Sequence, residues 1–184
     1  MTPPDYAIHM LVPLALMLGL AVWRDVSRHR IDNWITFPGV LLALGLQLWL
    51  AGMAGAAHAL GGLLIGLSVL LPFHVFGGMA AGDVKLMAAA GAFLGPMDTL
   101  FAAAAALLAG CLLALGVLIA RGTLRDGLGH VGRQLVLGTM THVWVPAAPG
   151  TAAAQRFPYA AAIACGCFAT VAWRLLTSAQ GLAS

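Results

Sequence analysis

Long apolar stretches separated by short polar connections dominate the sequence. A helix needs about 20 apolar residues to cross the hydrocarbon core of a bilayer. Besides five long apolar stretches, the chain has a shorter one at 86–94, which follows a segment of small residues. The pattern therefore predicts an all-α polytopic membrane protein, a bundle of about six transmembrane helices with a short fourth helix. The five longer stretches span 7–23, 34–53, 55–76, 100–120 and 157–176.

The composition agrees with a membrane protein and excludes several other classes. Of the 184 residues, 61% are hydrophobic and 8% are charged, and all six acidic residues are aspartates. A soluble domain carries about 25% charged residues. The net charge of +3 is the difference between nine cations and six aspartates. Nine cations are too few for a face that binds nucleic acid. The cysteines and histidines lack metal-ligand spacing, so we expect no metal site.

The cations predict the orientation of a single membrane-embedded domain over residues 1–184. The connections at about 24–33, 77–85 and 121–156 lie on one face of a six-span bundle, and they hold eight of the nine Lys and Arg residues. The positive-inside rule makes that face cytoplasmic. Both termini are then on the other side of the membrane. The exception, Arg174, is near the end of the last span.

The fourth helix, predicted over 84–95, is short for a membrane. Twelve residues give about 18 Å of helix, against a hydrocarbon core of roughly 30 Å. If its far end reaches the outer surface, the preceding loop at 80–83 lies below the cytoplasmic surface. Irregular backbone at that depth needs a water-filled cavity or surrounding protein. We therefore expect a small aqueous cavity around Asp83.

Two aspartates lie at this cytoplasmic edge. Asp25 follows the first apolar stretch and Asp83 precedes the fourth. Each has an ordinary interpretation: Asp25 as a solvated residue paired with Arg28 or Arg30, and Asp83 as a helix N-cap. Close together, however, two carboxyls share a proton, which provides an acid and a base to activate water against a peptide carbonyl. The other aspartates lie on the opposite face, in the long loop or in the first loop: Asp5, Asp98, Asp126 and Asp32.

Three segments resemble a known family. AGDVKL at 81–86 resembles the G-x-G-D-x-K-L signature of bacterial prepilin peptidases, the membrane aspartic proteases also called type IV leader peptidases. Asp25, shortly before RIDN at 30–33, resembles their second signature, an Asp ahead of R-I-P-N. FPYAAA at 157–162 resembles the P-Y/F-x-x-A segment that opens the family's last span.

The resemblance implies a six-span protease with Asp25 and Asp83 as its catalytic dyad. Such an enzyme removes the short basic leader from prepilin or pseudopilin precursors at the cytoplasmic face of the bacterial inner membrane, without a metal or organic cofactor. The chain lacks the C-x-x-C pairs of the family's N-terminal methyltransferase domain. It therefore resembles the short form associated with Flp/Tad pili, and methylation is not inferred.

Four residues are candidates for supporting or substrate-binding roles. Gly82 either lets backbone approach Asp83 or is a plain loop residue, and Lys85 either acts on the dyad and its loop or anchors the positive face. Arg30 and Asn33 either position the first loop and bind substrate carbonyls or are ordinary interfacial residues.

Two positions depart from the family pattern. Ala80 replaces the first glycine of G-x-G-D, and its methyl group either narrows the approach of substrate or forbids a positive φ. Asp32 replaces the proline of R-I-P-N, which changes the entry to the second span and adds a third carboxylate. Two other functions stay open: a small ion or proton channel or transporter, and a non-catalytic assembly protein of a pilus or secretion system.

Overall fold

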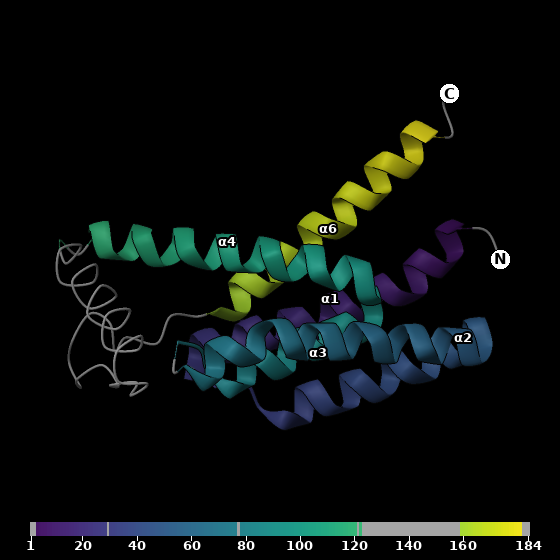
Figure 1. The fold of residues 1–184 in the computed structure, drawn as a ribbon, viewed down its shortest axis with the longest axis horizontal. Helices are drawn as coiled ribbons and strands as arrows, with labels where there is room; N and C mark the ends of the chain where they lie inside the picture. Colours follow the sequence, from purple (N-terminus) through teal and green to yellow (C-terminus); the bar gives the residue numbers. More distant parts are fainter. Residues whose placement is uncertain (1–2, 29, 77, 121, 123–158, 182–184) are drawn as a thin grey trace.

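The computed structural model describes residues 3–28, 30–76, 78–120, 122 and 159–181. The described residues form helices and no strands (Figure 1). Four helices are long and apolar enough to cross a membrane, whereas α3 has 14 residues and is too short. The all-α fold with several helices able to span a membrane is thus confirmed, and the count of about six spans is not. The five helices are α1 (Pro3–Arg28), α2 (Asn33–Val75), α3 (Ala81–Leu94), α4 (Pro96–Ala120) and α6 (Tyr159–Gly181).

The 43-residue helix α2 is broken at Gly52. Gly52 has φ 61° and ψ −148°, a backbone conformation that glycine reaches because it lacks a Cβ atom. The chain turns back there, so that Gly55 packs directly against the carbonyl group of Gln47. Figure 1 shows the two arms of α2 running side by side. The sequence predicted separate helices at 34–53 and 55–76, and the structure places the break between them at Gly52.

Helix α3 lies in the centre of the bundle, and ten of its 14 residues are buried. Its contact with the second arm of α2 is made by glycines: Gly62 packs on the backbone of Gly91, and Gly66 on the backbone of Met87. Small residues let membrane helices approach closely enough for van der Waals packing of their backbones. Gln47 from the first arm is buried, and its Nε2 donates to the carbonyl oxygen of Phe93 at 3.4 Å.

Two of the predicted loops are shorter than expected. Helix α1 continues to Arg28. Helix α3 already begins at Ala81, because small residues such as those at 81–83 fit a helix as readily as a loop. The predicted irregular segment at 80–83 and the predicted N-cap at Asp83 are therefore wrong. The N-cap is Ala80, and Asp83 is the third residue of the helix. The predicted loop at 121–156 lies, apart from Gly122, outside the described residues.

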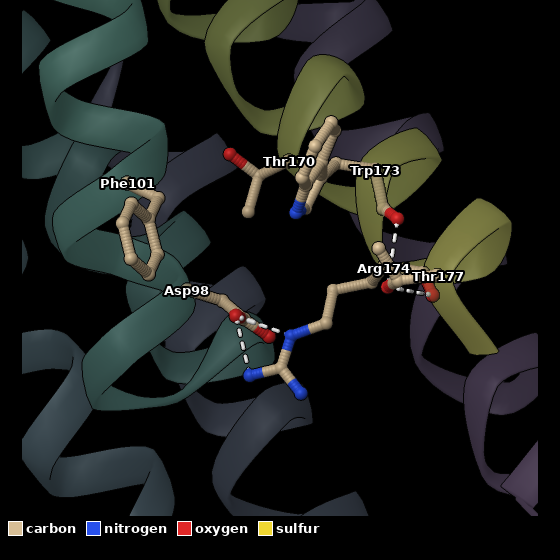
Figure 2. Close-up of a pocket in the computed structure, with 6 residues that line it drawn as sticks. All are labelled: Asp98, Phe101, Thr170, Trp173, Arg174 and Thr177. Atoms are coloured by element: carbon tan, nitrogen blue, oxygen red, sulfur yellow. Dashed lines mark hydrogen bonds and ion pairs between the residues drawn. The ribbon is translucent and has the colours of Figure 1, made fainter. Parts of the chain in front are cut away.

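Helices α4 and α6 pack together along small residues, with Gly166 against the backbone of Ala102 and Ala106. Farther along, the guanidinium group of Arg174 binds the Oδ1 atom of Asp98, with Nε and Nη2 each 2.7 Å away. Figure 2 shows this ion pair beside a cavity between the two helices. The cavity has a volume of about 650 Å³ and is lined by Asp98, Phe101, Thr170, Trp173, Arg174 and Thr177.

Several helix ends meet at one end of the bundle, which is the left side in Figure 1: the ends of α1 and α2 and the starts of α2, α3 and α6. The start of α1 and the end of α6 lie at the opposite end. Asp25, near the end of α1, and Asp83, near the start of α3, therefore lie at the same end of the bundle. At helix ends, backbone N–H and C=O groups lack partners inside their own helices.

We expect that Gly62→Ala destabilises the protein, because the added methyl group would meet the carbonyl of Gly91. Overpacking of this kind reduces the free energy of unfolding by about 1–3 kcal/mol. Gly45→Ala is the matched control in the same helix, since nothing lies within 4 Å of its Cβ position, and alanine favours a helix. Thermal unfolding in detergent measures the difference, and equal midpoints for the two variants would contradict the close α2–α3 contact.

Candidate active site

Asp25 lies in the last turn of α1 and is buried, with 6% of its surface exposed. Its Oδ2 atom accepts a hydrogen bond from the backbone N–H of Ala160 at 3.0 Å. Ala160 is the second residue of α6, and the first N–H groups of a helix have no partner within that helix. The start of a helix also stabilises negative charge. The interpretation of Asp25 as a solvated residue at a helix end is therefore wrong.

Asp83 lies in the first turn of α3, outside the four helices that are able to cross a membrane. It is buried to the same degree as Asp25. Burial raises the pKa of the Asp83 carboxyl, and the neighbouring charge of Asp25 raises this pKa further. The structure therefore brings the two aspartates within electrostatic reach of each other. Such a pair can hold one proton between a carboxylic acid and a carboxylate, which is the arrangement that acid–base catalysis needs.

Asp32 does not act as a third free carboxylate. Its Oδ2 atom binds Nη2 of Arg24 at 3.1 Å and accepts a hydrogen bond from Nε1 of Trp34 at 3.0 Å. The guanidinium carbon of Arg24 also lies 5.2 Å from the centre of the Trp34 ring, within range of a cation–π interaction. We call these three residues the Arg24–Asp32–Trp34 clasp. The clasp joins the last turn of α1 to the first turn of α2.

Ile31, which precedes α2, and Asn33, the first residue of α2, also contact α3. Ile31 packs against Gly82, where its Cβ lies 3.0 Å from the position that a Cβ of residue 82 would take. Nζ of Lys85 donates to Oδ1 of Asn33 at 3.0 Å. Three of the four predicted supporting residues thus lie at this contact. Arg30 is exposed and makes no hydrogen bond or ion pair within the described part of the chain.

Ala80 has φ −76° and ψ 147°, which are values that alanine adopts freely. The expected conflict between its methyl group and a positive φ is therefore absent. Next to it, Nδ1 of His74 lies 2.9 Å from the carbonyl oxygen of Met79. Since that oxygen accepts, the bond requires the proton on Nδ1. This contact holds the end of α2 to the turn that leads into α3.

Sequence reasoning missed Arg24 and Ala160. The sequence shows that Arg24 precedes Asp25 and can reach a nearby carboxylate. Its position among the cations of the first loop does not, however, indicate which carboxylate it binds. Ala160 lies in the FPYAAA segment that resembles the family, but it acts through its backbone N–H group, a role that no side-chain motif reveals. No cluster of three or more His, Cys, Asp or Glu side chains that is able to hold a metal ion occurs among residues 3–28, 30–76, 78–120, 122 and 159–181.

Comparison with known proteins identifies the family. The sequence profile of the type IV leader peptidase family matches residues 12–119, more than half of the 184-residue chain. The matched region includes Asp25, Asp83 and the residues between α1 and α2, and it ends before α6. No curated protein and no solved structure matches the chain. On the strength of the profile match, the chain belongs to the type IV leader peptidase family.

Proposed function

We propose that the protein is a membrane aspartic endopeptidase in which Asp25 and Asp83 activate a water molecule. The observation that carries this proposal is the burial of the two carboxyls at one end of the bundle, where the charge of Asp25 acts on Asp83. Membership of a leader peptidase family supports the reaction type. Burying two like charges together is unfavourable unless a proton is shared between them, and such sharing serves peptide hydrolysis.

The two carboxyls take different roles because their surroundings differ. Oδ2 of Asp25 accepts the Ala160 N–H bond, so Asp25 is the carboxylate that takes a proton from water. Asp83, whose pKa is raised, is the acid that donates a proton to the peptide carbonyl oxygen. The water oxygen then bonds to the carbonyl carbon. When the C–N bond breaks, Asp25 gives its proton to the leaving amine. Asp83 takes a proton back from a hydroxyl group of the tetrahedral intermediate, which becomes the new carboxyl group, and the dyad returns to its starting state.

The proposed substrate is a prepilin or pseudopilin precursor, cut between its short basic leader and its hydrophobic helix. The family supports this substrate class, and the protein partner would approach from within the lipid bilayer. The distribution of Lys and Arg supports an active site toward the cytoplasm of a bacterial inner membrane. In this topology each of the two arms of α2 crosses the membrane separately, and α3 is the short fourth helix that the sequence predicts.

A channel or transporter is less well supported by the charges. The sequence offers Arg174 as the charge on the outer half of a span, and this residue is held in the ion pair with Asp98. A non-catalytic assembly protein would keep the fold and lack cleavage. The cleavage assay below separates it from an enzyme.

Asp25→Asn and Asp83→Asn should each abolish processing. Asparagine keeps the shape of the side chain but neither accepts nor donates the catalytic proton, so the rate should fall by at least about 100-fold. Each variant is co-expressed with a cognate prepilin, and the shortening of the precursor is followed on a gel. Asp98→Asn is the control, because Asp98 pairs with Arg174 far from the dyad. Processing that survives either substitution would remove that residue from the dyad.

The pH dependence should show a loss of activity on the alkaline side. Asp83 acts as an acid and its pKa is raised by burial and by Asp25, so the active protonated form is present below that pKa and disappears as the pH rises through it. Initial rates of the detergent-solubilised enzyme, measured over a series from weakly acidic to alkaline pH, test this. A rate that stays constant or rises through the alkaline range would argue against Asp83 as the acid.

A further inference from the structure

The residues around the start of α2 touch both helices that carry the candidate dyad. On one side, the Arg24–Asp32–Trp34 clasp begins at the residue next to Asp25 in the chain. On the other side, Asn33 binds Lys85 and Ile31 packs on Gly82, the neighbour of Asp83. A continuous series of contacts thus runs from the end of α1, through the start of α2, to the start of α3.

The clasp depends on Asp32. Arg24 has a side chain that is 16% exposed, and that of Asp32 is 37% exposed. Nε of Arg24 is buried without a hydrogen-bond partner in the described chain, so the cation is held by Asp32 and by the face of Trp34. Removal of the Asp32 carboxylate leaves the mostly buried guanidinium group of Arg24 without its anionic partner. Loss of the Asp32 carboxylate should therefore release the end of α1 from the start of α2.

The backbone at Asp32 explains what the clasp does locally. Asp32 is the N-cap of α2 with φ −82° and ψ 142°, and its carbonyl oxygen accepts the N–H of Ile35 at 3.1 Å. Its side chain does not cap the helix, because it is bound to Arg24 and Trp34 instead. This φ is close to the value of about −65° that proline enforces. Proline at this position would thus hold similar backbone geometry without an ion pair.

We propose that the Arg24–Asp32–Trp34 clasp and the Asn33–Lys85 hydrogen bond position Asp25 and Asp83 relative to each other. The five residues act through the backbone of α1, α2 and α3, and they are positioning residues that do not touch the substrate. This inference rests on the proposed function, because it concerns the geometry of the same two carboxyls. It assigns to Asp32 a structural role that replaces its expected role as an additional carboxylate near the site.

The first experiment measures kcat and KM for Arg24→Ala, Asp32→Ala and the double variant with a purified prepilin-like substrate. Misplacement of a catalytic group by about 1 Å reduces a rate by up to about 100-fold. We expect kcat to fall by about 10- to 100-fold in each single variant, with KM little changed. The double variant should lose no more than the worse single variant, because both remove one interaction.

A second set of variants separates positioning from general stability. Asp32→Pro should restore much of the kcat lost in Asp32→Ala, because it fixes a similar φ. Asn33→Ala and Lys85→Ala alter exposed side chains, so they should lower kcat while the unfolding midpoint in detergent stays near that of the wild type. Asp98→Ala breaks the ion pair with Arg174 and is the control for removal of an ion pair elsewhere.

Amide hydrogen exchange tests the same idea without any substrate. Asp32→Ala and Arg24→Ala should speed exchange in the first turns of both α2 and α3, whereas Asp98→Ala should not. Asp32→Asn retains an oxygen for Trp34 and the shape of the side chain, so it provides a well-folded variant with a smaller effect.

Three results would overturn the inference: wild-type kcat in both clasp variants, a loss that is confined to KM, or unchanged exchange in α3. If the wild-type protein cleaves no prepilin, the proposed function fails. The exchange measurement still decides whether the clasp orders α3.

Discussion

The burial of two neighbouring carboxyls in an apolar helical bundle is the constraint on which the rest of this structure depends. A carboxylate inside a membrane protein is unfavourable unless hydrogen bonds or opposite charges compensate it. Asp25 is compensated by the first turn of another helix, through the Ala160 N–H. Asp83 has a raised pKa, which favours its neutral form. The bundle thus stabilises the pair in two ways: a hydrogen bond compensates the charge of Asp25, and burial favours the neutral form of Asp83.

Close backbone packing makes this arrangement possible. A helix of 14 residues in the centre of the bundle has few large side chains with which to hold its place. Its contacts are instead made by glycines that face glycines or carbonyl groups on α2, such as Gly62 against Gly91. Because many backbone atoms touch, α3 has a defined depth and rotation. The direction in which Asp83 points follows from that rotation.

The sequence was sufficient to predict apolar helices and the turn within residues 33–75, because apolar length and glycine are strong local signals. The scarcity of acidic residues also drew attention to Asp25 and Asp83, which are both buried in the structure. It did not define the ends of the helices near the site. Small residues such as those at 81–83 suit both helix and loop, and only packing against Ile31 and α2 decides between them. The ion pair of Arg24 with Asp32 depends on the direction of two helices, which hydropathy does not encode.

The hydrogen bond from the Ala160 N–H to Asp25 joins two parts of the chain that are synthesised at very different times. The N–H group binds Asp25 across 135 residues of sequence, and α6 is the last helix of the described chain. Contacts between residues so distant in sequence form late, because the intervening chain must first be ordered. During synthesis, Asp25 is made long before Ala160, its hydrogen-bond donor, exists. The hydrogen bond to Asp25 therefore forms only once α6 has been added, and a chain that ends before α6 carries both aspartates without the environment that distinguishes them.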